Sequence, residues 1–183
     1  MDAITLLKSD HRSVEKLFKS YEKAGDRAKA TKRKLVAQMI KELSIHAAVE
    51  EEIFYPAARR AVEETAPTVL ESLEEHHIVK WVLSELEGMD PGDERFDAKV
   101  TVLIELVRHH VDEEEHGLFP QVRATLGRSR LAEIGDQLEK AKRTAPTRPH
   151  PRQPDTPPAN LMAGMVAGVV DHARDAVKEM ANR

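Results

Sequence analysis

Two stretches of the chain, His46-Ala-Ala-Val-Glu50 and His110-Val-Asp-Glu-Glu114, carry the same spacing of a histidine and a glutamate. The first continues to Ile53-Phe54-Tyr55-Pro56 and the second to Gly117-Leu118-Phe119-Pro120, so a Pro follows each Glu six residues later. A single His-x-x-x-Glu pair arises readily by chance, but two copies with the same aromatic-Pro ending do not. The chain therefore contains an internal repeat, and this repeat decides the predicted fold and site.

The repeat extends towards the N-terminus of each half. Asp10-His11 matches Glu75-His76, because apolar residues follow each His at three, six and seven positions. The second copy lies 65 positions after the first at this His, and 64 positions after it at the His-x-x-x-Glu pair. Each half is therefore predicted to be a pair of helices that contributes one single His and one His-x-x-x-Glu pair.

Helical periodicity of apolar residues runs through nearly the whole chain, without a convincing strand pattern. The pattern predicts helices over residues 3–24, 28–64, 67–87 and 94–126, with Asp2 as the first N-cap. Pro56 is expected to kink the second helix, because its ring clashes with the preceding turn. Short connections make sequential helices antiparallel. The predicted fold class is therefore all-α, an up-down-up-down four-helix bundle with extra C-terminal helices.

Beyond the bundle, a helix predicted over residues 129–143 completes a first domain of residues 1–143. Residues 144–159 hold six of the ten prolines and no large apolar residue, which predicts a stiff, extended linker. The last unit, residues 160–183, is predicted to contain an amphipathic helix over about 160–181 that docks on its own bundle or forms a homodimer. Gly164 and Gly168 would permit close helix contact. The apolar stripe of this helix consists of Leu161, Met162, Met165, Val166, Val169, Val170, Ala173 and Val177.

Composition excludes several classes of function. The chain has no cysteine, which excludes thiol catalysis, disulfides, zinc ribbons and iron–sulfur clusters. Its net charge of −4 gives no argument for nucleic acid as a partner. The N-terminus lacks the features of a signal peptide, and no apolar run approaches the roughly 20 residues of a transmembrane segment. We therefore expect a cytoplasmic protein whose partners are small molecules.

Two helix hairpins related by a pseudo-two-fold axis would bring four imidazoles and two carboxylates together in the bundle core. Residues four apart share one helix face, about 6 Å apart along the axis, so each His/Glu pair could grip one site. Imidazole suits iron, zinc, copper and nickel, and carboxylate suits harder ions, so the mixture fits iron well. Manganese or zinc remains an alternative, although a structural zinc site needs only about four ligands and no repeat.

The pattern resembles the hemerythrin-like, HHE cation-binding family over about residues 1–126. The resemblance implies a non-haem di-iron centre with an oxo or hydroxo bridge, which binds O2, H2O2 or NO. It also implies that the two Glu residues bridge the irons. The six implied iron ligands are His11, His46, Glu50, His76, His110 and Glu114.

One departure from the family concerns the third predicted helix, where oxygen-carrying members have two His four residues apart. Here Lys80 lies four residues after His76, and Trp81 lies four residues after His77, so a fifth His is missing. Two six-coordinate irons offer about twelve positions, of which four His, two bridging Glu and one oxo bridge fill about ten. The open positions favour exogenous ligands such as peroxide.

Two further side chains are candidates for an open position, Tyr55 and His77. Tyrosinate is a good ferric ligand, but on a regular helix Tyr55 points away from Glu50 unless the kink at Pro56 rotates it. Alignment with the first half favours His76 over His77. Nearby His and acidic residues are expected on the surface or as hydrogen-bond partners of the ligand imidazoles. These are Asp10, Glu51, Glu52, Glu75, His109, Glu113, Glu115 and His116.

Three functions fit this predicted site. The first is a protein that binds O2 or NO, in a response to oxidative or nitrosative stress. The second is an enzyme with catalase- or peroxidase-like activity that removes H2O2. The third is an iron-dependent sensor or storage module in which metal occupancy controls the fold. The missing fifth His favours peroxide chemistry over reversible O2 carriage.

Overall fold

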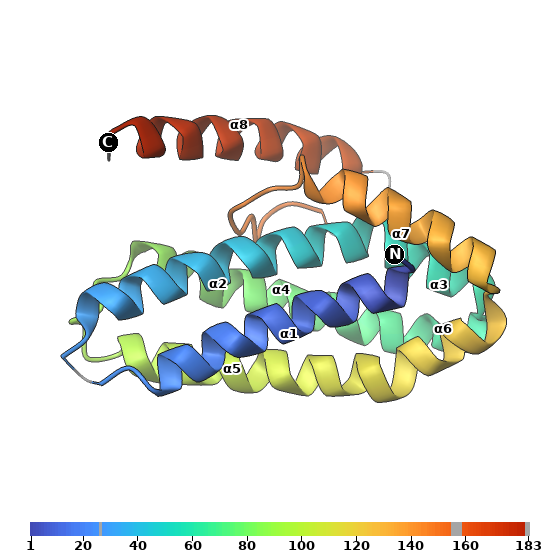
Figure 1. The fold of residues 1–183 in the computed structure, drawn as a ribbon, viewed down its shortest axis with the longest axis horizontal. Coiled ribbons are helices and arrows are strands. Elements are labelled where there is room, and N and C mark those ends of the chain that lie inside the picture. Colours follow the sequence, from blue (N-terminus) through green and yellow to red (C-terminus); the bar gives the residue numbers. More distant parts are fainter. Residues whose placement is uncertain (26, 155–158, 182–183) are drawn as a thin grey trace.

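The computed structural model describes residues 1–25, 27–154 and 159–181, and the regular structure in them is entirely helical. Four long helices form an up-down-up-down bundle, as predicted (Figure 1). Within it, α1 packs against α2, α4 against α5, and α2 against α4. Asp2 caps the first helix by accepting a hydrogen bond from the backbone N–H of Thr5 at 3.0 Å. The bundle helices are α1 (Ala3–Glu22), α2 (Lys29–Val49), α4 (Ala66–Gly88) and α5 (Phe96–Glu113).

Shorter elements extend the bundle at one end. They are η1 (Glu50–Phe54), α3 (Tyr55–Ala61), η2 (Glu63–Thr65), η3 (Glu114–Leu118), α6 (Phe119–Thr125) and α7 (Arg128–Lys142). Helix α8 (Ala159–Ala181) has 23 residues and lies outside the four-helix bundle (Figure 1). The predicted helices at 67–87, 129–143 and 160–181 match α4, α7 and α8 to within about one residue. None of the helices in the described part of the chain combines the length and apolarity needed to cross a membrane.

The second and fourth predicted helices are wrong in one respect, because each is interrupted by a π-helix at the repeated motif. In η1 the backbone N–H of Tyr55 bonds to the carbonyl of Glu50, five residues back. In η3 the N–H of Phe119 bonds to the carbonyl of Glu114. A Pro follows at once in both copies, where its ring would clash with the carbonyl four residues back. The wider π turn therefore replaces the predicted kink.

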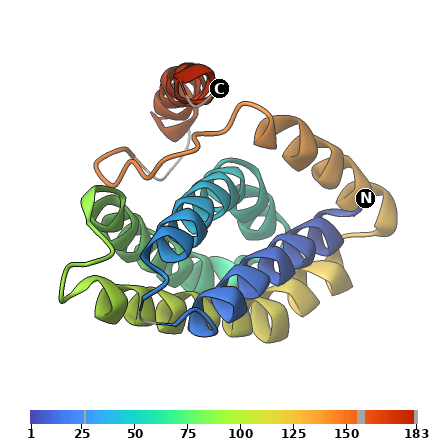
Figure 2. The same ribbon diagram turned by 60° about the vertical axis from the view of Figure 1, so that its left-hand side comes forward.

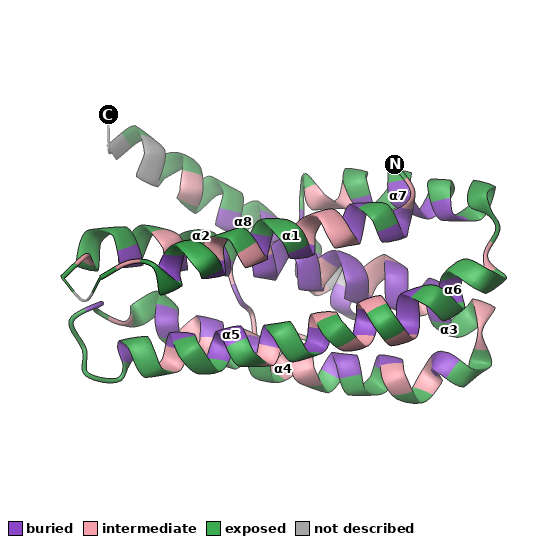
Figure 3. Cartoon of the chain, turned by 60° about the horizontal axis from the view of Figure 1, so that its bottom comes forward, coloured by how far each residue is buried: buried purple, intermediate pink, exposed green. Residues whose placement is uncertain are grey.

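Buried apolar side chains form two clusters, one at each end of the four-helix bundle. One lies between α1, α2, α4 and α5 and includes Phe18, Leu83 and Leu103. The other surrounds α3 and α6 and includes Phe54 and Phe119. Helix α7 covers this second cluster with the buried side chains of Leu131, Ile134 and Leu138. The inward faces of the bundle helices are accordingly buried (Figure 3).

The predicted linker is packed against the bundle, which corrects the expectation of an extended spacer. Residues 144–154 have no regular structure and run between α8 and α2 (Figure 2). Within them Ala145, Pro146, Thr147 and Pro149 are buried. Residues 155–158 of the predicted linker and the final residues 182–183 lie outside the described residues. The prolines here therefore stiffen a segment that covers the bundle.

Helix α8 docks on its own chain, but with the opposite face from the one predicted. The buried residues are small or polar, and the apolar stripe contains the exposed Met165, Val166, Val169, Val170 and Val177. The buried face comes very close to the chain, because a Cβ at Gly168 would clash with the carbonyl oxygen of Thr144. The buried carboxylate of Asp171 accepts hydrogen bonds from the backbone N–H groups of Thr147 and Arg148, both at 3.1 Å. Hydrogen bonding and close backbone approach, rather than apolar area, therefore set the orientation of α8.

The described part of α8 leaves its apolar stripe facing solvent. Contact between two copies through this stripe stays a prediction of the sequence. Leu161 and Met162, also assigned to the stripe, belong to the helix, but the positions of their side chains lie outside the description.

Replacing Asp171 by Ala is expected to release α8 and residues 144–154 from the bundle, because two backbone N–H groups lose their buried acceptor. Limited proteolysis should then cut the 144–154 segment at least about tenfold faster than in the wild type. This factor corresponds to a loss of about 1.4 kcal/mol in the free energy that docks the segment on the bundle. Asp136→Ala, at an exposed position of α7, is the matched control. Equal cleavage of Asp171→Ala and wild type would contradict this role.

Candidate metal centre

The bundle brings together all six side chains that the repeat singled out. Each bundle helix supplies one His, and each π-helix begins at one of the two Glu residues. All six side chains are buried, although each carries ionisable or metal-binding atoms. They are His11 of α1, His46 of α2, His76 of α4, His110 of α5, and Glu50 and Glu114 at the starts of η1 and η3.

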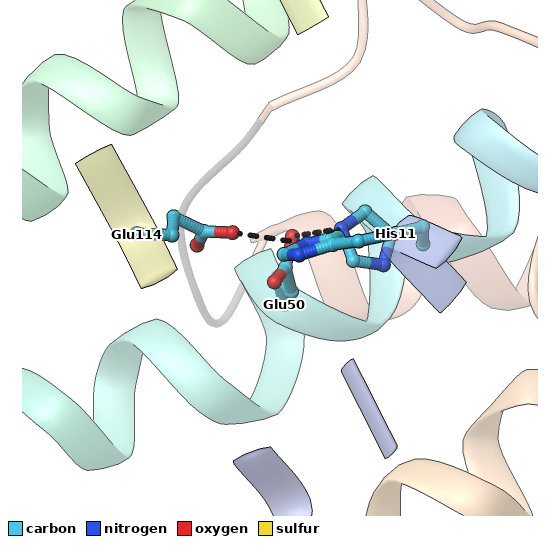
Figure 4. Close-up of side chains that lie close together, drawn as sticks. His11, Glu50 and Glu114 are labelled. Carbon is cyan, nitrogen blue, oxygen red and sulfur yellow. Dashed lines mark hydrogen bonds and ion pairs between the residues drawn. The ribbon is translucent and has the colours of Figure 1, made fainter. Parts of the chain in front are cut away.

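The six side chains form two groups that share carboxylates. In the first group, His11 Nε2 lies 3.2 Å from His46 Nε2, and Glu50 Oε2 lies 3.0 Å from His46 Nε2. Glu114 Oε2 approaches His11 Nε2 to 3.3 Å (Figure 4). Four ligand atoms, one from each of these residues, all lie within 4.8 Å of one another.

The second group is built around the other two helices. His76 Nε2 lies 3.1 Å from His110 Nε2. Glu50 Oε2 is 3.6 Å from His76 Nε2, and Glu114 Oε2 is 3.6 Å from His110 Nε2. Both carboxylates therefore lie between the two pairs of imidazoles. This arrangement offers two adjacent positions for a cation, with the carboxylates shared between them.

Carboxylates on the outside of the cluster orient the imidazoles. An acceptor beside Nδ1 holds the ring proton there, so that the Nε2 lone pair points into the centre, as is usual for metal-binding His. Glu51, Glu75 and Glu115 were expected as surface or supporting groups, and they take the supporting role. Three Nδ1 atoms lie within hydrogen-bond distance of a carboxylate oxygen: that of His11 with Glu115 at 2.9 Å, that of His76 with Glu51 at 3.0 Å, and that of His110 with Glu75 at 2.7 Å. The Nδ1 of His46 is 3.6 Å from Asp10, which is too far for a hydrogen bond, and has no hydrogen-bond partner among the described residues.

The centre has the polarity that a metal cation requires. Both carboxylate oxygens of Glu50 and Oε2 of Glu114 are buried without hydrogen-bond geometry to any described residue. Burial of an unsatisfied polar group costs roughly 2–7 kcal/mol, and more for a charged one. The Nε2 lone pairs of the imidazoles face the same space. Since orphaned acceptors and lone pairs converge, the residues present fit a bound metal.

The pKa shifts of the buried groups also fit a centre that binds a metal cation. Burial and the neighbouring Glu114 raise the pKa of Glu50. Burial also opposes ionisation of Glu114, but His110 and His11 outweigh it and lower its pKa to about 2. Burial lowers the pKa of His46, but Glu50 outweighs this effect and raises it to about 10. The positive charge on His46 therefore helps to balance the buried carboxylates, and a bound cation could take over this role.

Tyr55 reaches the centre, and the π-helix explains how. Its hydroxyl donates to Glu114 Oε1 at 3.0 Å and lies 3.3 Å from His76 Nε2 and 3.5 Å from His110 Nε2. The i→i+5 geometry of η1 brings Tyr55 onto the same face as Glu50, which a regular helix would not. The Pro six residues after each Glu was the sequence signal for this turn. Burial, Glu114 and Glu50 raise the pKa of Tyr55 well above 10, so that without a cation the phenol keeps its proton.

Phe119 is the equivalent of Tyr55 in the second copy of the repeat, and nothing in the sequence indicated that it contacts the centre. Phe119 follows η3 as Tyr55 follows η1, and its ring stacks on His11 with the centroids 5.8 Å apart and the planes at 9°. Tyr55 lies against His76, the equivalent of His11, with the centroids 5.5 Å apart but the planes tilted by 36°. At this aromatic position the two halves of the centre therefore differ by one hydroxyl group.

Lys80 occupies the position of the missing fifth His, and it forms an ion pair instead of binding at the centre. Lys80 turns to Glu51 and donates to both of its carboxylate oxygens, at 2.8 and 2.9 Å. Glu51 in turn accepts from His76. The structure does not bring His77 to the centre, because His77 lies further out and accepts a hydrogen bond from the indole N–H of Trp81 at 3.2 Å.

Other His and acidic residues near the motif lie outside the centre. His116 is exposed and pairs with Asp112. His109 is exposed beside Glu75 and Glu113, and these three form a surface group with metal-ligand spacing. Exposed acidic groups of this kind are common without a bound ion.

The centre is open on one side. A cavity of about 520 Å3 reaches the four imidazoles from the surface between α1 and α5. On the opposite side, Phe54 and Leu118 are completely buried and pack in the apolar cluster that includes Phe119. Small molecules can therefore reach the centre from the α1–α5 side.

The family model of the hemerythrin HHE cation-binding domain matches residues 2–122. The chain belongs to this family. An uncharacterized hemerythrin-like protein of Schizosaccharomyces pombe is 28% identical over 171 residues, which cover 93% of this chain and 83% of that protein. A DNA nickase of a Nostoc species is 28% identical over 142 residues, and the chain spans 39% of its length.

A solved structure supports the assignment of the fold. It is that of a hemerythrin HHE cation-binding domain-containing protein from Mycobacterium kansasii. The TM-score is 0.67 and the identity 22%, with 78% of this chain and 86% of that chain covered. This HHE domain therefore has the family fold, with His/Glu clusters that could bind metal.

His110→Ala is expected to lower the metal content of the purified protein sharply, because it removes one imidazole from a buried group of ligands. His116→Ala, six residues further along the chain but exposed, should keep the wild-type metal content. Plasma mass spectrometry of both variants, with helical content checked by circular dichroism, makes the comparison. Equal metal content in the two variants would contradict the proposed centre.

Proposed function

We propose that this HHE domain holds two iron ions and decomposes hydrogen peroxide. One iron would be held by His11 and His46, and the other by His76 and His110. The carboxylates of Glu50 and Glu114 would bridge the two, since each lies between the two pairs of imidazoles. The mixture of imidazole and carboxylate ligands supports iron over softer or harder metals.

The observation that carries the proposal is the position of the Tyr55 hydroxyl. Its distances to Glu114, His76 and His110, 3.0 to 3.5 Å, are like those among the other candidate ligand atoms. With both carboxylates shared, each iron would have two imidazoles and two carboxylate oxygens, and the Tyr55 hydroxyl would add a further ligand on the His76/His110 side. A ferric ion would lower the pKa of the phenol and make tyrosinate a ligand.

A tyrosinate ligand favours peroxide decomposition over reversible O2 binding. Its negative charge stabilises the ferric state, whereas reversible O2 binding starts from two ferrous ions. With Tyr55 bound, the count of open positions falls from about two to about one. One open position at a ferric centre suits peroxide better than O2. Bound iron would supply the redox chemistry that converts two H2O2 into one O2 and two H2O.

The chain itself contributes positioning and access. Glu115, Glu51 and Glu75 hold the protons of three imidazoles on Nδ1, and Lys80 fixes Glu51 in this role. The apolar side chains of Phe54 and Leu118 keep water away from one side of the centre. Peroxide would enter through the cavity between α1 and α5.

Tyr55→Phe tests the tyrosinate ligand. The ferric wild type is expected to show a visible charge-transfer band from tyrosinate to iron, and the variant should lack it. Because only two Tyr residues are present, Tyr21→Phe is the matched control. Tyr21 bonds to Asp97, and the control should keep the band. A band that survives in Tyr55→Phe, or no band in the wild type, would overturn this assignment.

Peroxide decomposition can be measured directly. With H2O2 added to the iron-loaded protein, an oxygen electrode should record one O2 for each two H2O2 consumed. His110→Ala should lose most of this activity, while His116→Ala retains it. A diferrous protein that forms a stable, reversible O2 adduct and evolves no O2 from peroxide would instead support an O2-binding protein. Loss of helical signal on chelation, without turnover, would support the sensor or storage alternative.

The activity named for the Nostoc protein is not part of this proposal. The chain spans 39% of the length of that relative, so the activity named for the whole protein is not carried over to this chain. The net charge of −4 also gives no electrostatic support for DNA binding.

A further inference from the structure

The cavity above the imidazoles is larger than a diatomic gas or peroxide requires. Its volume of about 520 Å3 falls within the range of roughly 300–1,000 Å3 that is typical of sites for organic ligands. It extends along α1 from His11 to Lys19, which are eight residues or about 12 Å apart along the helix. With C–C bonds of about 1.5 Å, an extended alkyl chain of about ten carbons has a similar length.

Apart from the four imidazoles, the inner wall of the cavity is apolar. Side chains from all four bundle helices contribute to it, and most of them are buried. An alkyl chain in contact with this wall would leave water, which contributes about 25 cal/mol for each Å² of apolar surface buried. The apolar lining residues are Val14 and Phe18 of α1, Leu43 and Ala47 of α2, Val79 of α4, and Val107 and Val111 of α5.

The rim of the cavity is charged, and most of its charges are paired. Arg108 bridges α5 to α1 by hydrogen bonds to Glu15 and Glu22. Lys19 also pairs with Glu15, at 3.5 Å. Glu115 pairs with Lys8 and His11, and Asp112 pairs with His116.

Two positively charged side chains at the rim have no ion-pair partner among the described residues. Arg12 and Lys16 lie one turn apart on α1, both are exposed, and neither forms an ion pair with another described residue. Side chains four apart on a helix share one face, so both can reach one anionic group. The cavity thus combines an apolar interior with an unneutralised cationic edge.

We propose that this cavity binds a linear carboxylate of about ten carbons, such as a medium-chain fatty acid. The carboxylate would lie between Arg12 and Lys16, and the alkyl chain would lie along the wall formed by Val14, Phe18 and Val79. A ligand in this position covers the entry to the four imidazoles. The inference concerns binding alone, and it stands whether or not the centre decomposes peroxide.

Isothermal titration calorimetry of the full-length, iron-loaded protein with decanoate tests the proposal. We expect saturable binding of one decanoate per chain, with decan-1-ol and decyltrimethylammonium at least about tenfold weaker. The double variant Arg12→Ala/Lys16→Ala should weaken decanoate about fivefold or more, as expected for two solvent-exposed ion pairs, and leave decan-1-ol unchanged. Lys34→Ala/Lys140→Ala, which removes two exposed charges elsewhere, should bind decanoate as the wild type does.

A second variant tests the location. Val111 is partly exposed in the cavity wall, so Val111→Trp should fill the cavity and abolish decanoate binding. Its circular dichroism and iron content should match those of the wild type, which separates a filled cavity from a misfolded protein. Three results would each overturn the proposal: no saturable binding by the wild type, equal losses in the two double variants, or unchanged binding by a folded Val111→Trp. Calorimetry does not depend on O2 evolution, so a failure of decanoate binding can be distinguished from a failure of peroxide decomposition.

Discussion

The structure depends on one constraint, the burial of two carboxylates between four imidazoles. Glu50 and Glu114 are completely or almost completely buried, and three of their four oxygens lack a hydrogen-bond partner among the described residues. Such a centre is unfavourable by itself and becomes favourable around cations. The two apolar clusters on either side of it hold the four helices at the spacing that the imidazoles need. The same constraint accounts for Glu51, Glu75 and Glu115, because each of these carboxylates fixes the direction of an imidazole lone pair.

The internal repeat gives the centre an approximate two-fold symmetry, and a few residues break it. Tyr55 and Phe119 occupy equivalent positions after the two π-helices, yet only one carries a hydroxyl group. Lys80 supports Glu51 on the His76 side, where an oxygen carrier of this family would have a further His. The open cavity lies between α1 and α5, whereas the C-terminal segment covers the α2 side. These differences would make the two metal positions chemically unequal.

The C-terminal segment illustrates how hydrogen bonds can outweigh apolar area. An amphipathic stripe normally turns towards the protein, because burial of apolar surface is favourable. In α8 the small residues Gly164 and Gly168 allow the backbone to approach residue 144 and Glu52 closely. Asp171 then satisfies two backbone N–H groups of the proline-rich segment. That docking leaves the apolar stripe exposed.

The sequence by itself determined the helical class, the repeat and the six candidate ligands, because residue spacing on a helix translates directly into a shared face. It also placed the boundaries of α4, α7 and α8 to within about one residue. Only the tertiary structure decided which additional side chains reach the centre and which face of α8 docks, because spacing on a regular helix does not determine either. The π-helix rotates Tyr55 into the centre, since one extra residue in the turn shifts every following side chain. The pairing of Lys80 with Glu51 and the face on which α8 docks depend on contacts between residues far apart in the chain, which periodicity does not encode.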